Sequence, residues 1–177
     1  MIRGLTVATL SVFLALALYH PSLARPATTD KAPARLNLEL GAYNVVRAFS
    51  KDSNSASSFA LEYQDVPRLP YDIQLVAGIL SNTDQDWFWY AGAVKDFDVA
   101  TSTVLSLGFA PGYYVYGNKS VNLHNGLEFK SQIGLSYELQ DKKRIGVSFA
   151  HISNASIGED NPGVEVLSLT YSHPLSW

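Results

Sequence analysis

The sequence has no cysteine, and its acidic and basic side chains nearly cancel, giving a formal net charge of −3 over 177 residues. Without cysteine, no disulfide bond holds the chain together. A charge so close to neutral gives no electrostatic basis for binding nucleic acid, so no nucleic-acid partner is expected. Long apolar runs are also missing beyond the first residues, which removes the signal of a membrane-spanning helix from the rest of the chain.

The one long apolar stretch lies at the start of the chain. Arg3 precedes an apolar segment from about Leu5 to Tyr19, and a small-x-small pattern ends at Ala24. This arrangement predicts a secretory signal peptide over residues 1–24, because about 15 apolar residues are too few to span a bilayer as a helix. Residues 25–177 should then form one exported domain, with a short lead-in rich in Pro, Thr and Ala.

Apolar and polar residues alternate with a period of two through most of the remaining chain, which typifies strands that have two different faces. Aromatic residues are abundant, with ten Tyr, eight Phe and three Trp. No helix is required after the signal peptide. The sequence therefore predicts an all-β fold of eight strands, at residues 36–46, 57–65, 71–80, 87–95, 101–111, 126–139, 143–153 and 164–173.

Periodicity alone does not separate a soluble sandwich from a small membrane barrel. The strands are near the 9–11 residues that a tilted membrane strand needs, their number is even, and aromatic clusters at 87–90 and 112–116 lie near strand ends. The last residue, Trp177, resembles the C-terminal aromatic signature of bacterial outer-membrane proteins. Together these features favour an eight-stranded antiparallel transmembrane β-barrel of the outer membrane.

Loop lengths predict which end of such a barrel faces outward. Connections after the first, third, fifth and seventh predicted strands are mostly long, and the others are mostly short. Outer-membrane barrels keep their short turns in the periplasm and their long loops outside. The end of the seventh strand and the start of the eighth should therefore lie at the outer leaflet.

The segment at this end carries polar side chains on the face that should meet lipid. His151 and Ser153 share the apolar parity of the seventh strand, and Glu165 shares that of the eighth. If these strands pair through the loop 154–163, Glu165 lies across from His151. A nucleophile, a base and an orienting acid so placed suit a serine hydrolase. Polar residues at strand ends also commonly do no more than meet water, so the pattern alone leaves both interpretations open.

The stretch HISNASIGEDNPGVE resembles the active-site segment of the PagL-type lipid A 3-O-deacylases, outer-membrane barrels of Gram-negative bacteria. The shared elements are H-x-S-N-A, then N-P-G and the acidic residue that follows, and IGLSYEL, RIG and YSHPL nearby are also similar. The resemblance implies His151 as base, Ser153 as nucleophile and Glu165 as the acid that orients the histidine. It further implies that Asn154, with backbone N–H groups around Ala155, stabilises the oxyanion.

The implied reaction is hydrolysis of the ester that holds the 3-hydroxyacyl chain at position 3 of lipid A, with lipopolysaccharide in the outer leaflet as the partner. We expect the acyl chain to lie along an apolar groove formed by Phe149, Leu167 and Leu169. No cofactor or metal is expected, because a serine triad with oxyanion donors suffices for ester hydrolysis. Over residues 25–100 the resemblance extends only to the architecture.

Two other functions remain open from the sequence. One is a phospholipase-type barrel, with or without calcium, although that architecture uses twelve strands and residues 25–177 are few for so many. The other is a passive structural or adhesive barrel. The sequence does not determine acyl-chain preference, how the activity is regulated, or whether the protein forms a homodimer.

Overall fold

The computed structural model describes residues 32–48, 55–117, 119, 121–124, 126–157 and 160–175. The predicted signal peptide, residues 1–24, and Trp177 lie outside these residues. The described strands are β1 (Ala34–Tyr43), β2 (Ala56–Leu69), β3 (Ile73–Asn82), β4 (Trp87–Ala100), β5 (Thr103–Val115), β6 (Leu127–Glu138), β7 (Arg144–Ser153) and β8 (Val164–Leu175).

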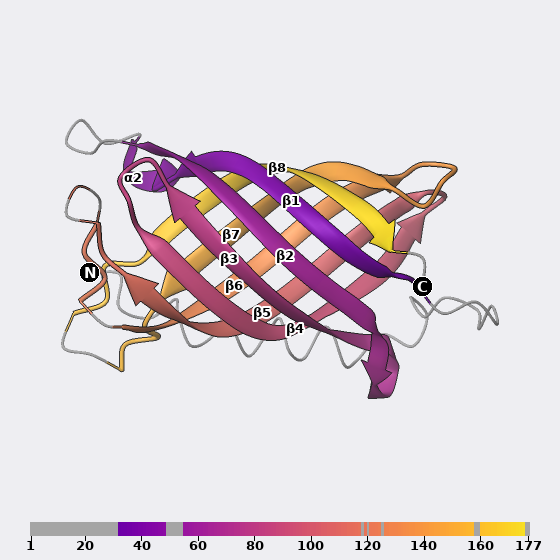
Figure 1. Ribbon diagram of the computed structural model, residues 1–177, viewed down its shortest axis with the longest axis horizontal. Coiled ribbons are helices and arrows are strands. Elements are labelled where there is room, and N and C mark those ends of the chain that lie inside the picture. Colours follow the sequence, from indigo (N-terminus) through magenta and orange to yellow (C-terminus); the bar gives the residue numbers. More distant parts are fainter. Residues whose placement is uncertain are drawn as a thin grey trace.

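The eight strands close into a barrel in the order of the chain, as Figure 1 shows. Each strand pairs with the next in antiparallel register, and β8 returns to pair with β1. The predicted all-β, eight-stranded antiparallel barrel is therefore confirmed. Closure leaves no strand edge exposed along the wall, which satisfies the backbone hydrogen bonds of every strand.

Two short helices correct the expectation that no helix follows the signal peptide. The first strand, predicted to reach residue 46, ends at Tyr43, because Asn44 takes a left-handed conformation (φ 63°) and Val45–Ala48 form helix α2. The 3-10 helix η2 (Pro70–Asp72) joins β2 to β3 and replaces the predicted start of the third strand. Proline fixes φ near the helical value and favours such a turn.

Neither α2 nor any other helix within the described residues has the length and apolar character needed to cross a membrane.

Strands β2, β4 and β5 run further than predicted. The cluster Trp87–Tyr90 at the start of β4 pairs with residues 112–115 at the end of β5, a stretch predicted to follow that strand. Both neighbours of every strand in a closed barrel offer hydrogen-bond partners, so pairing continues after the apolar alternation has faded. The rings of Trp87 and Trp89 stack with centroids 5.9 Å apart, and Tyr113 is exposed beside them.

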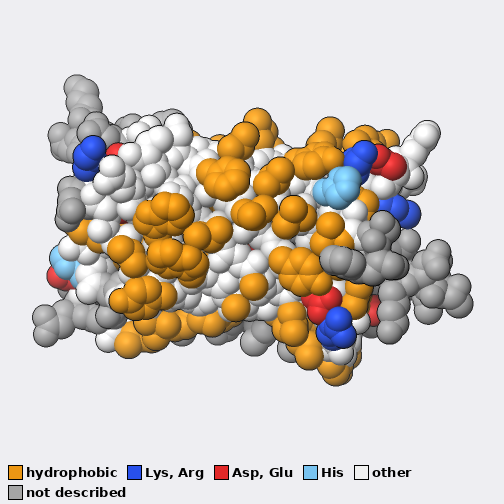
Figure 2. Space-filling view, viewed as in Figure 1, with side chains coloured by type: hydrophobic (Ala, Val, Ile, Leu, Met, Phe, Trp, Pro, Cys, Tyr) orange, Lys and Arg blue, Asp and Glu red, His pale blue; other side chains and the backbone are white. Residues whose placement is uncertain are grey.

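The outer surface of the barrel is apolar around its middle, as the hydrophobic side chains in Figure 2 show for one face. An apolar belt of this extent would be costly in water and suits contact with lipid. The belt is built from alternate residues of the strands, including Leu40, Leu75, Phe109, Ile133, Leu135, Ile145, Val147, Phe149, Leu167 and Leu169.

The interior is polar over much of its length, and several of its charges are paired. Lys130 Nζ donates to the Tyr90 hydroxyl at 3.0 Å and lies 3.6 Å from a Glu62 oxygen. Arg144 Nη1 donates to Asp96 at 2.6 Å. A lone buried charge costs several kcal/mol, whereas a paired and hydrogen-bonded one is tolerated. These pairs let charged side chains fill the barrel.

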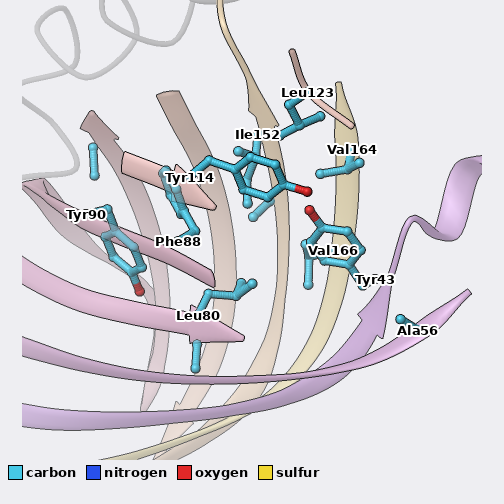
Figure 3. Close-up of a cluster of buried hydrophobic side chains, with 13 residues drawn as sticks. Tyr43, Ala56, Leu80, Phe88, Tyr90, Tyr114, Leu123, Ile152, Val164 and Val166 are labelled. Carbon is cyan, nitrogen blue, oxygen red and sulfur yellow. The ribbon is translucent and has the colours of Figure 1, made fainter. Parts of the chain in front are cut away.

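The ends of the barrel differ as the loop lengths predicted, with one exception. Long connections follow β1, β5 and β7, but only residues 83–86 join β3 to β4. At this end an apolar cluster that includes Tyr43, Phe88 and Tyr114 closes the interior (Figure 3). Ile152 and Val164 belong to it, are fully buried, and face each other across β7 and β8. This cluster lies on the inner side of the part of the wall that carries His151, Ser153 and Glu165.

Candidate active site

The hairpin of β7 and β8 brings the predicted base and acid together. His151 and Glu165 are direct partners in the antiparallel register, although 14 positions separate them in the chain. His151 Nδ1 lies 3.1 Å from Glu165 Oε1, and the two side chains are 34% and 21% exposed. A carboxylate at this position accepts a hydrogen bond from Nδ1–H and leaves the lone pair of Nε2 to act as the base.

Ser153 follows His151 by two residues, so both side chains leave the same face of β7. This is the outward face, because Val147 and Phe149 on the same parity are exposed, whereas Ser148 and Ala150 are buried inside. Ser153 is nevertheless only 6% exposed. The nucleophile candidate is therefore on the lipid side of the wall but covered.

The second ring nitrogen of His151 has no hydrogen-bond partner within the described part of the chain. Its Nε2 atom is buried, and no hydrogen bond between His151 and Ser153 is present there. Gly163 lies against this edge of the ring, since a Cβ built on it would be 2.8 Å from Cε1 and 3.3 Å from Nε2. The structure thus brings His151 to Glu165 and places Ser153 nearby without a direct bond.

Asn154, predicted as an oxyanion donor, is fully buried and holds the loop between β7 and β8. Its Nδ2 donates to the Asp160 carbonyl at 2.7 Å, and its Oδ1 accepts from the Ser156 N–H at 2.9 Å. Its own backbone N–H donates to Asn161 Oδ1 at 3.2 Å. The side chain ties both ends of the loop together directly beside Ser153.

The backbone around Ala155 turns sharply. Ala155 and Ser156 both have positive φ values, 54° and 63°, and Ile157 N donates to the Asn154 carbonyl at 3.0 Å. A turn of the backbone can orient N–H groups toward an anion. The N–H groups of Ser156 and Ile157 are already bonded within the loop. The Ala155 N–H, one residue beyond Asn154, has no hydrogen-bond acceptor within the described residues.

The residues predicted to form the apolar groove occupy two strands. Phe149 precedes His151 on the outward face of β7 and is exposed. Leu167 pairs with Phe149, and Leu169 pairs with Val147, both on the outward face of β8. Leu167 and Leu169 therefore lie on the same strand as Glu165, on the side of β7 away from β6.

Sequence reasoning missed two contributors to this region. Asn161 and Gly163 were noted only as part of the shared N-P-G element, yet Asn161 bonds both the Asn154 N–H and the Ser156 hydroxyl, and Gly163 contacts His151. The N-P-G sequence was the available signal, because Gly163 needs its positive φ of 56° and an extra methyl group would strike the ring. Only the folded loop reveals what that turn touches.

Within the residues that the structure describes, no three His, Cys, Asp or Glu side chains are grouped so that they could hold a metal ion.

Comparison with known families identifies residues 80–174, more than half of the chain, as a match to the model of lipid A 3-O-deacylase (PagL). The curated lipid A deacylase PagL of Bordetella bronchiseptica (strain ATCC BAA-588 / NCTC 13252 / RB50) is 32% identical over 88 residues, 48% of this chain and 49% of that protein. The chain thus spans about half the length of this curated relative.

Solved structures match over most of the chain. The crystal structure of the outer membrane enzyme PagL matches with a TM-score of 0.61 and 18% identity, over 80% of this chain and 99% of that one. A de novo designed transmembrane β-barrel matches with a TM-score of 0.58 and 10% identity, over 82% and 98%. At these identities the likeness concerns the fold, and it confirms the predicted transmembrane β-barrel.

Proposed function

Since this chain belongs to the PagL family of lipid A 3-O-deacylases, we propose that it is an outer-membrane serine esterase that removes the 3-hydroxyacyl chain from position 3 of lipid A. The observation that carries the proposal is the pairing of His151 Nδ1 with Glu165 Oε1 at 3.1 Å, two residues from Ser153 on the same outward face. On a lipid-facing wall, a Glu–His pair that had no function would only lower the stability of the barrel.

In the proposed reaction, Ser153 Oγ attacks the ester carbonyl of the substrate while His151 Nε2 takes the hydroxyl proton. Glu165 fixes the ring through Nδ1–H and stabilises the imidazolium that forms. The tetrahedral intermediate then collapses, and the sugar oxygen leaves with the proton from Nε2. Water, deprotonated by the same nitrogen, attacks the acyl-serine and releases the fatty acid. Hydrogen bonds between nucleophile and base are often long before substrate binds, so the missing bond between Ser153 and His151 is compatible with these roles.

The oxyanion of the intermediate requires preorganised donors. We assign this role to Asn154 and the Ala155 N–H, with the side chain of Asn154 acting mainly through the loop that it ties to Asp160 and Ser156. The Ala155 N–H adjoins the nucleophile in sequence and follows a sharp turn. One donor of this kind is typically worth about 10²–10³ in rate.

The location of the site suits a lipid substrate. His151 and Glu165 lie at the long-loop end of the barrel and on its outward face. In an outer membrane with long loops outside, this is the level of the lipid A headgroup in the outer leaflet. Lipid A can then reach Ser153 by lateral diffusion while its acyl chains remain in the membrane.

The test is mass spectrometry of lipid A from cells that express the wild-type protein or Ser153→Ala. Loss of one 3-hydroxyacyl group with the wild type alone supports the deacylase and its nucleophile. Equal loss with both proteins would reject Ser153 as nucleophile. No loss with either, while both barrels fold, would favour a phospholipase or a passive barrel, and phospholipid hydrolysis in detergent separates those two.

A further inference from the structure

The outward side chains around Ser153 differ on its two flanks, and this asymmetry bears on where the acyl chain of the proposed substrate lies. On the β6 side, Ser153 pairs with Phe129 and His151 pairs with Ser131. On the β8 side, His151 pairs with Glu165, and Gly163 contacts the histidine ring. A chain bound at Ser153 must pass one of these flanks to reach the middle of the membrane.

The β8 flank is closed by polar chemistry. A chain that leaves Ser153 toward Leu167 would cross the hydrogen-bonded pair of His151 and Glu165, both partly exposed on the outward face. Covering a carboxylate with methylene groups removes its remaining water, which costs free energy that the apolar contact must offset.

The β6 flank offers a passage over a small side chain that has apolar neighbours. Ser131 pairs with His151 on one side and with Phe109 of β5 on the other. Its side chain is smaller than those of its outward neighbours Phe109, Phe129 and Ile133. The rings of Phe109 and Phe129 stack with centroids 5.9 Å apart and planes 10° from parallel. They form a continuous aromatic wall beside Ser131.

Below Ser131 the surface is apolar and exposed toward the middle of the barrel. Ile133 follows it on β6 and pairs with Phe149 of β7, and Leu135 pairs with Val147 in the same way. An acyl chain that crosses Ser131 therefore continues over aliphatic and aromatic side chains. On either side of this path stand the aromatic wall of β5 and β6 and the ring of His151.

We propose that the acyl chain of the substrate leaves Ser153 across Ser131 and runs over Ile133 and Phe149, so that the small side chain at position 131 admits long chains. This inference rests on the proposed esterase function and deepens it. Diagonal neighbours on adjacent strands lie roughly 7–8 Å apart, so an acetyl group on Ser153 ends before position 131, whereas a myristoyl chain must pass it. Phe149 keeps its predicted role, and Leu167 and Leu169 lie outside the path.

The experiment compares purified full-length barrels in detergent on two synthetic monosaccharide analogues of lipid A that carry an acetyl or a myristoyl ester at position 3. Ser131→Phe should lower kcat/KM for the myristoyl ester roughly tenfold or more, the scale of steric discrimination in apolar sites, and leave the acetyl ester within about twofold. Ser131→Ala should match the wild type on both esters. Ala91→Phe, which adds a ring at another exposed position of the outer wall on β4, controls for the added aromatic surface.

The outcomes separate the path from the function. If Ser131→Phe has the same kcat/KM as the wild type on each of the two esters, and circular dichroism shows that both barrels are folded, the path is overturned while the esterase stands. Chain-dependent loss in Leu167→Phe instead would place the chain on β8 and also overturn it. No hydrolysis of either ester by the wild type would reject the proposed function, and the path with it.

Discussion

Gly163 and His151 are in direct contact, with the Cα of Gly163 so close to the ring that a Cβ there would lie 2.8 Å from Cε1. Gly163 also has a φ of 56°, which side chains adopt only with strain. The glycine therefore permits the turn that carries the chain into β8 and, at the same time, leaves room for the ring that bonds Glu165.

Gly163→Ala should lower kcat by roughly 10–100-fold, because a shift of the ring by about 1 Å misplaces the base. The measurement is steady-state hydrolysis of lipid A by the purified variant. Gly146→Ala is the matched control, since its Cβ would meet the Leu135 carbonyl oxygen at 2.3 Å, away from the candidate triad. If both variants lose activity only in proportion to their folded fraction, the positioning role of Gly163 is refuted.

Glu165→Gln should reduce kcat by roughly 10³–10⁴-fold while the barrel folds normally, because an amide that donates to Nδ1 holds the wrong tautomer of His151. Hydrolysis of lipid A, followed by mass spectrometry, measures the loss. A distant outward residue of the same strand, Tyr171, which pairs with Ile145, provides the control in the variant Tyr171→Phe. Wild-type activity in Glu165→Gln would mean that the 3.1 Å contact is structural.

Asn154→Ala should lower kcat by about 10²–10³-fold with a smaller change in KM, because the loop that Asn154 holds presents the Ala155 N–H to the oxyanion of the transition state. The variant loses the bonds to Asp160 and Ser156 that shape the turn at Ala155. Asn161→Ala leaves the Asn154 side chain in place and removes the bonds of Asn161 to the Asn154 N–H and to the Ser156 hydroxyl, so it should lose less. A rise in KM with unchanged kcat would count against the oxyanion role.

Lys130→Met should destabilise the barrel by about 3–5 kcal/mol, because it leaves the buried Glu62 without its cation. The double variant Lys130→Met with Glu62→Gln should recover much of this loss, since no unpaired charge remains. Denaturant unfolding in detergent, followed by tryptophan fluorescence, measures both. Additive losses in the double variant would show that the pair does not couple.

Chelation should leave the activity of the purified protein unchanged. A serine nucleophile with a histidine base and oxyanion donors completes ester hydrolysis without a Lewis acid. The assay is hydrolysis of a detergent-solubilised synthetic ester with and without EDTA, which avoids the effect of chelators on lipopolysaccharide packing. Loss of activity that calcium restores would point to the phospholipase-type alternative.

Local sequence pattern determined the wall of the barrel and the direction of its side chains. The period-two alternation placed Phe149, His151 and Ser153 on one outward face, and loop lengths placed them at the long-loop end. These features follow from the backbone geometry of single strands, so no distant contact is needed to infer them. Strand ends were less well predicted, because pairing with neighbours rather than alternation extends β4 and β5.

Tertiary structure decided what these residues meet. The register of β7 and β8 set Glu165 opposite His151, and a slip of one residue would have turned the glutamate into the barrel. The register of β6 brought Ser131 beside His151, and the folded loop placed Gly163 against its ring. Such contacts depend on closure of the whole sheet, which fixes each strand against both of its neighbours. No single segment of the sequence determines this closure.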